Sequence, residues 1–316
     1  MAETPVAPAP PTPPTPPTPP AVVKPIEKPI TIVTPAMKPQ RSLTASLASE
    51  WLVQLRETVI IAGNPKGAGK TTFALSATQP GQRTVVVACD LGKLSIPPMV
   101  DKSNVLVVPY QALTREISEG HSKPVKDVYL KLTGDLYEIY DSIRKDRAIR
   151  LDGGKEFAPP HNVILDGVSR LNGMLVDGQC SLNNILDPSD LDNKAFKFWG
   201  KRLRDILAIV EQFASLPCNV ILTAWVEEKK TPEGQGTGVY FPDVGGKMDV
   251  LAAGEMSNAL YGYSRQGRFF VRTKADGSTP WIGMRDRYSN LPSEIDVTIE
   301  GKPHEKSPWQ RVFGDV

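Results

Sequence analysis

The sequence is poor in the residues from which several classes of functional site are built. It has three cysteines and three histidines among 316 residues. The cysteines are odd in number and widely separated, which argues against a disulfide framework and favours a reducing compartment. The histidines, His121, His161 and His304, show no metal-ligand spacing. Each is therefore expected to be exposed or hydrogen-bonded rather than bound to a metal.

The chain also lacks a strong charge of one sign and any long apolar run. Its net charge of +2 gives no overall basic signal for nucleic acid, so contact with DNA has to come from a local patch. No apolar stretch reaches the length of a membrane span, and no basic start precedes an apolar run at the N-terminus. We therefore expect no membrane association and a cytoplasmic location.

Proline, by contrast, is abundant at one end of the chain. Almost half of the 30 prolines lie before residue 41, in a region that contains "PTPPTPPTPP". Because proline fixes φ and has no backbone N–H, residues 1–41 are predicted to form a polyproline II or disordered arm. This Pro-rich arm is either a ligand for a protein partner or a spacer. Residues 42–300 are expected to form the main domain, and residues 301–316 a C-terminal tail.

The main domain alternates short apolar runs with amphipathic segments. Strands are predicted at 58–63, 83–90, 104–110, 162–167 and 219–225, and helices at 42–57, 71–77, 124–148 and 192–217. This alternation predicts an α/β fold with a mostly parallel central sheet flanked by helices. Residues 227–246 are expected to be a polar loop. Residues 258–275 are expected to be an antiparallel hairpin that turns at Gln266–Gly267.

The stretch "NPKGAGKTT", residues 64–72, nearly fits the phosphate-binding pattern G-x-x-x-x-G-K-[ST] between a strand and a helix. Asn64 occupies the first glycine position. Asparagine tolerates positive φ, so either Asn64 makes the turn or the loop begins at Gly63. The backbone of such a loop binds the phosphates of ATP. The predicted nucleotide-binding residues are Asn64, Gly67, Ala68, Gly69, Lys70, Thr71 and Thr72.

Four side chains complete the predicted site. Lys70 is expected to reach the β- and γ-phosphates, and the Thr71 hydroxyl to bind Mg²⁺. Asp166 ends the apolar strand "VILD" and is expected to hold Mg²⁺ through water. Asp90 ends the run "VVVACD" and is a candidate to activate the attacking water, with a helix N-cap as the alternative. A dinucleotide site is set aside because G-x-G-x-x-G is absent.

The order of these motifs resembles the RecA-like P-loop ATPase core. More narrowly, it is similar to phage-encoded RecA-core nucleotide-binding proteins associated with single-strand annealing and recombination. The stretches "VILDGVSRL", "NVILTAW" and "GMRDRYSNLPSEI" carry the resemblance with the phosphate loop, over about residues 58–298. It implies a Mg²⁺-dependent ATPase that assembles as a homo-oligomeric ring or filament on single-stranded DNA, in the cytoplasm of a phage host.

The resemblance also implies roles for individual residues. Arg285 and Arg287 match the two basic residues that reach the γ-phosphate of a neighbouring subunit, and in a strand they share one face. The alternative is a pair of surface arginines bound to Asp286 or Glu294. Two departures concern the catalytic acid and the polar sensor. The catalytic acid of RecA-like proteins is usually glutamate, whereas here it is Asp90. The polar sensor is expected near the end of the strand at 219–225. Thr223 is a candidate for it, but Trp225 stands where histidine or glutamine often occurs.

DNA-binding loops in RecA-like cores follow the last core strands, a place that residues 227–246 occupy here. Lys229 and Lys230 are candidates to contact phosphates, and Tyr240 or Phe241 to stack on bases. The alternative is a solvated loop whose aromatic residues pack against the core. Residues 169–184 are a weaker candidate for a second DNA-binding loop.

Two other functions remain open on the sequence alone. The phosphate loop also resembles the ParA-type loop with one glycine deleted, and Lys66 lies four residues before Lys70 rather than five. A ParA-like switch would use nucleotide to control assembly. An ATP-binding module with little turnover is the other possibility, since the usual catalytic glutamate is missing. These functions differ in ATP turnover and DNA dependence rather than in fold.

Overall fold

The computed structural model describes residues 56–64, 66–90, 94–110, 115–118, 121–186, 195–245, 254–274, 285–286, 291–302 and 305–314. All of them belong to one unit, Leu47–Val316. The predicted Pro-rich arm and most of the predicted helix at 42–57 lie outside the described residues.

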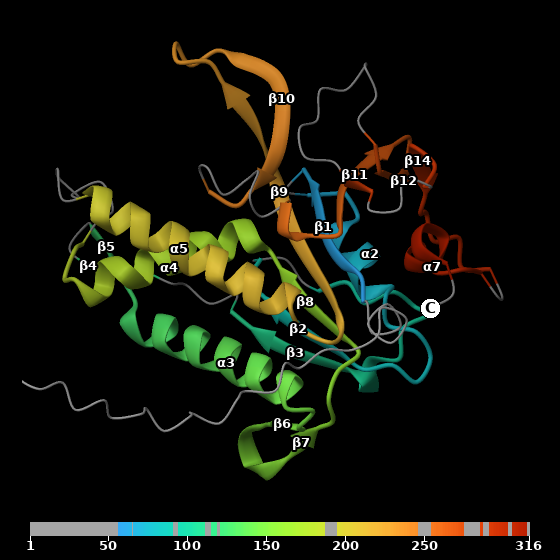
Figure 1. The fold of residues 1–316 in the computed structure, drawn as a ribbon, viewed down its shortest axis with the longest axis horizontal. Coiled ribbons are helices and arrows are strands. Elements are labelled where there is room, and N and C mark those ends of the chain that lie inside the picture. Colours follow the sequence, from blue (N-terminus) through green and yellow to red (C-terminus); the bar gives the residue numbers. More distant parts are fainter. Residues whose placement is uncertain are drawn as a thin grey trace, which may run out of the picture. The chain divides into compact units, whose positions relative to one another are not determined.

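A ten-stranded sheet forms the centre of the fold (Figure 1). Eight of its strands follow the order β14-β12-β11-β1-β9-β8-β2-β3, while β10 pairs with β9 and β13 pairs with β11. Six neighbouring strands of this sheet, from β11 to β3 in that order, run parallel. They are β1 (Thr58–Gly63), β2 (Thr84–Ala88), β3 (Val105–Pro109), β8 (Asn162–Asp166), β9 (Asn219–Lys230) and β11 (Asn258–Arg265). Strands β2 and β8 are buried along their whole length, as expected of apolar β-branched runs covered on both faces.

The strand order brings together segments that are far apart in the sequence. Strand β9 lies between β1 and β8, with Trp225 opposite Gly63 and Thr223 opposite Asp166. Strand β2 pairs with the other side of β8, and Ala88 lies opposite Asp166. The carboxyl ends of β1, β2 and β8 therefore meet around the middle of β9 at one edge of the parallel sheet, which we call the carboxyl edge.

Antiparallel strands extend the sheet beyond β11. They are β12 (Arg268–Arg272), β13 (Arg285–Asp286) and β14 (Glu294–Asp296). Strands β11 and β12 form the predicted hairpin, and its turn has left-handed backbone at Gln266 (φ 52°) and Gly267 (φ 76°). Two successive positive φ angles are typical of the turn that matches the twist of a two-residue hairpin.

The predicted polar loop at 227–246 is wrong for most of its length. Strand β9 continues to Lys230, and β10 (Gly236–Asp243) pairs back on it as a two-stranded ribbon that extends from the sheet (Figure 1). Polar composition indicates exposure, but a ribbon with solvated side chains satisfies its backbone groups by strand pairing. The β-forming run around Tyr240 and Phe241 was the signal for it.

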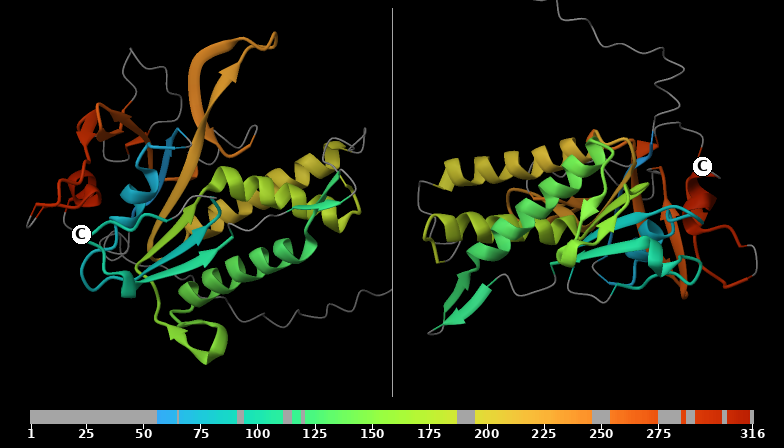
Figure 2. Two further views of the ribbon diagram at one scale, coloured as in Figure 1. Left: turned by 180° about the vertical axis from the view of Figure 1, so that it is seen from behind. Right: turned by 90° about the horizontal axis from the view of Figure 1, so that it is seen from below.

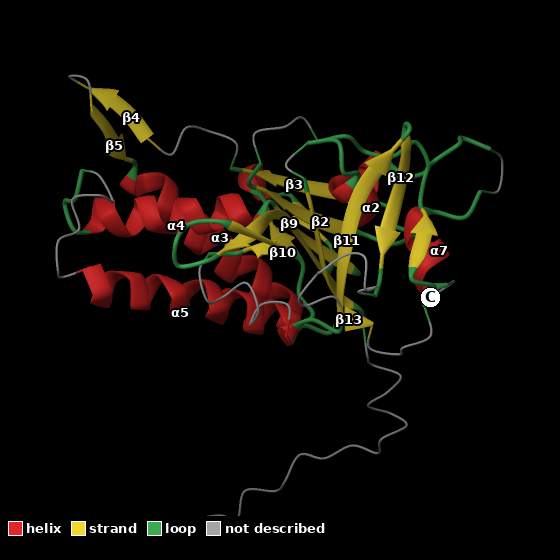
Figure 3. Ribbon diagram, turned by 90° about the horizontal axis from the view of Figure 1, so that it is seen from above, coloured by secondary structure: helices red, strands yellow, loops and turns green. Residues whose placement is uncertain are grey.

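Helices cover both faces of the sheet (Figures 1, 2 and 3). Helices α3 (Lys126–Arg144), α4 (Val168–Leu182) and α5 (Ala195–Ala214) lie over one face, and α2 (Lys70–Leu75) and α7 (Pro308–Phe313) over the other. Each face has its own apolar core, one around Leu132, Leu171 and Val210 and one around Phe73. The fold is thus α/β, with a mostly parallel sheet flanked by helices and an antiparallel hairpin, as predicted.

Two further expectations change. Most of residues 169–184 lies in helix α4, not in a loop, because Leu171, Met174 and Leu175 recur at helical spacing and are buried. In the segment expected to be a tail, Trp309 of α7 is 1 % exposed and packs against Phe73 at a ring-centroid distance of 5.8 Å.

Small elements complete the described fold. Two short hairpins are formed by β4 (Arg115–Ser118) with β5 (His121–Pro124) and by β6 (Ile149–Arg150) with β7 (Glu156–Phe157). Two 3₁₀ turns are η1 (Lys102–Asn104) and η2 (Asp152–Gly154). Among the described residues, no helix has the length and apolar character needed to cross a membrane.

Candidate functional site

The predicted phosphate loop leaves the carboxyl edge at the end of β1 and leads into α2. Its left-handed residues are Gly67 (φ 73°) and Gly69 (φ 71°), and Asn64 does not adopt positive φ. The proposal that Asn64 makes the turn is therefore wrong. A Cβ on Gly63 would lie 2.3 Å from the carbonyl oxygen of Gly262, so only glycine fits there. This constraint belongs to the pairing of β1 with β11, in which Gly63 lies opposite Gly262, and a loop that begins at Gly63 stays a prediction.

Lys70 folds back across this loop. Its Nζ donates hydrogen bonds to the carbonyl oxygens of Asn64, at 2.5 Å, and Gly63, at 3.5 Å. The side chain is only 6 % exposed, and burial lowers the pKa of Lys70, against the opposing effects of Asp90 and Asp166. The structure thus holds an ammonium inside the curve of the loop, where backbone carbonyls compensate it at hydrogen-bond distance.

Thr71 and Asp166 meet beside Lys70. Thr71 Oγ1 donates a hydrogen bond of 2.9 Å to Asp166 Oδ1, and Thr223 Oγ1 donates one of 2.7 Å to the same oxygen. Thr223 Oγ1 in turn accepts the backbone N–H of Gly167 at 2.8 Å. Thr223 of β9 therefore fixes the carboxyl end of β8 through two hydrogen bonds of one hydroxyl.

The surroundings of Asp166 fit a divalent cation. The carboxylate is 4 % exposed, and burial raises its pKa although the two threonine hydrogen bonds act against that rise. Oxygen donors from a hydroxyl and a carboxylate are the ligands that Mg²⁺ prefers in proteins. Thr71 and Asp166 are the residues that would hold such an ion here.

Asp90 lies on the other side of Asp166. A Cβ on Gly167 would come within 2.7 Å of the Asp90 carboxyl carbon, so Gly167, at φ 95°, provides the space for Asp90. Burial raises the pKa of Asp90, whereas Lys70, Trp225 and then Arg170 lower it. A carboxylate whose burial favours its protonated form is a better proton acceptor than one in water.

Two buried polar atoms at this edge have no hydrogen-bond partner. Among the described residues, the buried side-chain nitrogen and oxygen atoms without a hydrogen-bond partner are Asp90 Oδ1 and Trp225 Nε1. The indole N–H lies near enough to lower the pKa of Asp90, yet the two groups do not form a hydrogen bond of proper geometry. The backbone N–H of Trp225, by contrast, donates to Ser169 Oγ at 2.8 Å. Unpaired buried groups are rare, and these two lie near each other, at the edge where Lys70 and Asp166 also lie.

The structure thus brings Lys70, Thr71, Asp90 and Asp166 to one edge of the sheet from separate segments of the chain. Ala68, a residue of the loop itself, is buried at 5 % exposure, and Thr72 lies in the first turn of α2. Arg285 belongs to β13, whose backbone pairs with β11 at Ala259. Its side chain and the whole of Arg287 lie outside the described part of the chain.

The candidate DNA-contacting residues all lie on the β9–β10 ribbon. Lys229 and Lys230 are at the end of β9, and Tyr240 is opposite Glu228 on β10. Phe241 is 8 % exposed, whereas Tyr240 is partly exposed. Of the two aromatic residues, Tyr240 therefore presents the larger surface for stacking.

Sequence reasoning missed three residues at the site. Arg170 and Ser169 lie in the first turn of α4, directly after Asp166–Gly167, and Arg170 is close enough to lower the pKa of Asp90. Their position inside "VILDGVSRL" was the available signal. Phe269 of β12 lies over the phosphate loop, because a Cβ on Gly69 would be 2.9 Å from its ring. That contact joins segments far apart in the sequence and gave no sequence signal.

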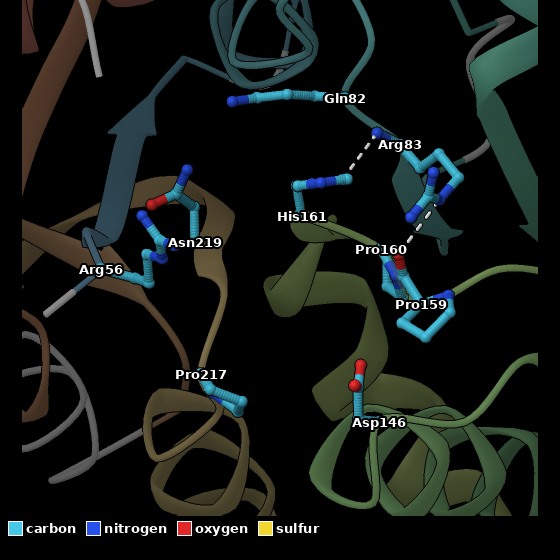
Figure 4. Close-up of a pocket in the computed structure, with 9 residues that line it drawn as sticks. All are labelled: Arg56, Gln82, Arg83, Asp146, Pro159, Pro160, His161, Pro217 and Asn219. Atoms are coloured by element: carbon cyan, nitrogen blue, oxygen red, sulfur yellow. Dashed lines mark hydrogen bonds between the residues drawn. The ribbon is translucent and has the colours of Figure 1, made fainter. Parts of the chain in front are cut away.

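A cavity of about 480 Å³ opens elsewhere, among the loops that precede β1, β2, β8 and β9 (Figure 4). The backbone N–H of Arg83 donates to His161 Nδ1 at 3.1 Å, and Arg83 Nε donates to the Pro159 carbonyl at 3.1 Å. Burial lowers the pKa of His161, and Arg83 and Arg56 act in the same direction. His161 is thus hydrogen-bonded, and the described residues contain no group of histidine, cysteine and acidic side chains suited to a metal.

A family model described as an AAA domain matches residues 56–274, which is more than half of the chain and includes the phosphate loop, Asp90, Asp166 and Trp225. No curated protein matches the chain.

Proposed function

The chain belongs to this AAA-domain family, and on that premise we propose that it is a Mg²⁺-dependent, RecA-like ATPase that acts on single-stranded DNA. Family membership indicates nucleotide-binding ATPase activity. The observation that carries the proposal is the convergence of Lys70, Thr71 and Asp166, with the Thr71–Asp166 hydrogen bond of 2.9 Å, beside a loop with left-handed glycines.

The proposed reaction is attack of water on the γ-phosphorus of ATP. The new phosphorus–oxygen bond forms as the bond to the β–γ bridging oxygen breaks, giving ADP and phosphate. Lys70 exchanges its carbonyl partners on the loop for phosphate oxygens and offsets the charge that develops on them. A bound Mg²⁺, held by Thr71 and Asp166, would neutralise further phosphate charge.

Asp90 is the proposed acceptor of the proton from the attacking water. Its pKa is raised by burial, and its Oδ1 has no competing hydrogen-bond partner. Aspartate is one methylene shorter than the glutamate usual in RecA-like proteins. The Asp90 carboxyl lies against Gly167, where a Cβ would come within 2.7 Å of it, so a glycine next to Asp166 leaves room for this carboxylate.

The finer parts of the proposal concern partners. We expect a homo-oligomeric ring or filament in which Arg285 and Arg287 reach the nucleotide of a neighbouring subunit. Lys229, Lys230 and Tyr240 on the ribbon are the proposed contacts to single-stranded DNA, and Phe241, which is 8 % exposed, is the less accessible aromatic residue. The Pro-rich arm is a proposed contact for another protein. A phage origin and action in the host cytoplasm remain part of this proposal.

The decisive experiment measures ATP hydrolysis by the full chain with and without single-stranded DNA. Lys70→Ala is expected to abolish turnover. The matched control is Lys66→Ala, because Lys66 is an exposed lysine of the same loop. Stimulation by DNA together with loss in Lys70→Ala supports the proposal. Tight ATP binding with negligible turnover, indifferent to DNA, contradicts it and favours a binding module.

A ParA-like switch predicts a different result from the same variants. Lys66→Ala would then abolish nucleotide-dependent association of the chain, measured by sedimentation, and turnover would be slow. DNA contact is tested with Lys229→Ala and Lys230→Ala, with Lys145→Ala at the end of α3 as the control. Each ribbon variant is expected to weaken DNA binding. The slope of the logarithm of the binding constant against the logarithm of the salt concentration should fall by about one for each lysine removed.

A further inference from the structure

A second cavity, of about 180 Å³, lies directly beside the phosphate loop. At one end it is bounded by Gly69 and Thr72, the start of α2. Its walls come from β12 and the segment that follows β14, and they include Phe269, Val297, Thr298, Ile299 and Pro308. None of the residues that line it is charged. A chemical group bonded to phosphates in the loop would therefore lie next to this uncharged cavity.

Phe269 forms the wall nearest to the loop. Side chains alternate along a strand, so Phe269 and Phe270 point to opposite faces of β12. Phe269 packs with the core on the α2 side, whereas Phe270 stacks on Tyr263 at 5.6 Å. The ring of Phe269 is so close to the loop that a Cβ on Gly69 would lie 2.9 Å from it. The loop and this aromatic ring thus form one continuous surface.

The backbone around this wall is fixed by hydrogen bonds. The N–H of Phe269 donates to Thr298 Oγ1 at 2.8 Å, and its carbonyl accepts the N–H of Val297 at 2.9 Å. The hydroxyl of Thr298 is therefore already engaged with Phe269. The walls offer hydrocarbon surface and few side-chain hydrogen-bonding groups.

The far wall is attached to α2 by the C-terminal helix. Trp309 packs on Phe73, and its backbone N–H donates to Ser76 Oγ at 2.9 Å in the core. Residues 297–308 lie beyond the part of the chain that the family model matches, which ends at residue 274. This wall is therefore a contribution of this chain's own C-terminal segment.

We propose that this cavity binds the base and ribose of a purine nucleoside triphosphate, with Phe269 stacked against the base. The inference rests on the proposed function, since it places the nucleoside next to phosphates held by Lys70. A flat aromatic ring gains from stacking on Phe269. A site that hydrogen-bonds its ligand rejects analogues strongly, whereas an apolar pocket discriminates weakly. Adenine and guanine are thus accepted with similar affinity.

The test compares ATP, GTP and inorganic tripolyphosphate, each with Mg²⁺, by calorimetry on the full chain. Tripolyphosphate carries the phosphates without a nucleoside. Phe269→Leu is the main variant because it removes the ring but keeps an apolar side chain for the core. It is expected to weaken ATP and GTP about tenfold each and to leave tripolyphosphate unchanged. Phe269→Tyr is expected to restore ATP binding, and Phe270→Leu is the control on the other face.

The possible failures are distinguishable. If tripolyphosphate binds as tightly as ATP to the unaltered chain, or if Phe269→Leu weakens both equally, the cavity is not the nucleoside site while the ATPase proposal stands. An affinity for ATP more than about a hundredfold above that for GTP contradicts recognition by an apolar pocket. If neither ATP nor tripolyphosphate binds, the proposed function itself is wrong, and this inference is wrong with it.

Discussion

The two ends of the central parallel strands carry polar groups in opposite states. At the amino ends, Asn162 and Asn219 are buried and hydrogen-bonded to each other at 2.8 Å. Asn162 also donates to Thr84 Oγ1 at 3.1 Å, and Asn219 accepts the backbone N–H of Glu57 at 3.0 Å. At the carboxyl edge, Asp90 and Trp225 each bury a polar atom without a partner.

This difference separates structural from functional polarity within one sheet. The amino-end network joins β2, β8 and β9 through side chains that are hydrogen-bonded to one another, so it stabilises the register of these strands. The carboxyl edge concentrates charges whose pKa values are displaced by burial, namely those of Lys70, Asp90 and Asp166. Buried polar groups without a partner cost stability unless a ligand bonds to them, so we expect the ligand of the proposed function at this edge.

The largest effect is expected from Asp90→Asn, which tests whether the carboxyl edge serves function rather than stability. The amide keeps the size of the side chain but cannot take a proton from water, so the hydrolysis rate is expected to fall by about a hundredfold or more. ATP affinity is expected to change little. The unfolding temperature of the nucleotide-free variant should hold or rise, because the substitution removes a buried charge. An unchanged hydrolysis rate would show that Asp90 is not the proton acceptor.

Asn162→Ala tests the opposite end of the same sheet. It removes partners of Asn219 and Thr84 inside the protein, so the free energy of unfolding is expected to fall by about 2–3 kcal/mol. ATP turnover per folded molecule should stay the same. Urea unfolding and a steady-state assay of one preparation measure both quantities. Loss of turnover without loss of stability would contradict the structural role assigned to this end.

Trp225→Phe sharpens the comparison within the carboxyl edge. It removes the unpaired indole N–H but keeps an aromatic ring, so stability should be equal or slightly higher, because no hydrogen bond is lost. If the N–H completes its bonding only when nucleotide and water are bound, kcat is expected to fall about fivefold to tenfold with KM nearly unchanged. A rise in KM at constant kcat would instead indicate a role in binding alone.

Much of this contrast was accessible from the sequence. Asp90 and Asp166 each follow a run of apolar β-branched residues, and parallel strands bring such ends to one edge. Lys70 and Thr71 follow from the motif and its position between a strand and a helix. The amino-end network was not predictable in the same way, because asparagine as the first residue of each of two predicted strands is also common in turns and does not indicate a partner.

The remaining errors have one physical origin. Residues 169–184 and 227–246 were interpreted from their polar composition and from the place of loops in a resembling fold. Strand pairing of Tyr240 with Glu228 and the helical spacing of Leu171 and Leu175 outweigh that composition. The unpaired state of Trp225 and the contact of Phe269 with the loop depend on long-range packing, which one sequence does not specify.

The smallest expected effect concerns pH and the amino end. His161 Nδ1 accepts the N–H of Arg83, and protonation of that nitrogen breaks the bond. The pKa of His161 is lowered below its usual value of 6.5, first by burial and then by Arg83 and Arg56. In that range the unfolded chain binds more protons than the folded chain. The contribution of neutral His161 to the free energy of unfolding is therefore fully present above pH 6.5, and it is lost as pH falls through the lowered pKa.

Because His161 is largely exposed, solvent screening limits this loss to below about 1 kcal/mol. Urea unfolding at about pH 7.5 and about pH 5 is compared for the unaltered chain and His161→Asn, whose amide oxygen accepts the same N–H without titrating. The difference between the two chains should widen at the lower pH, while ATP hydrolysis at the higher pH stays equal. Equal acid sensitivity of the two chains would contradict the assignment of this loss to His161, and the carboxyl edge cannot account for it, because the raised pKa values of Asp90 and Asp166 favour the folded chain as pH falls.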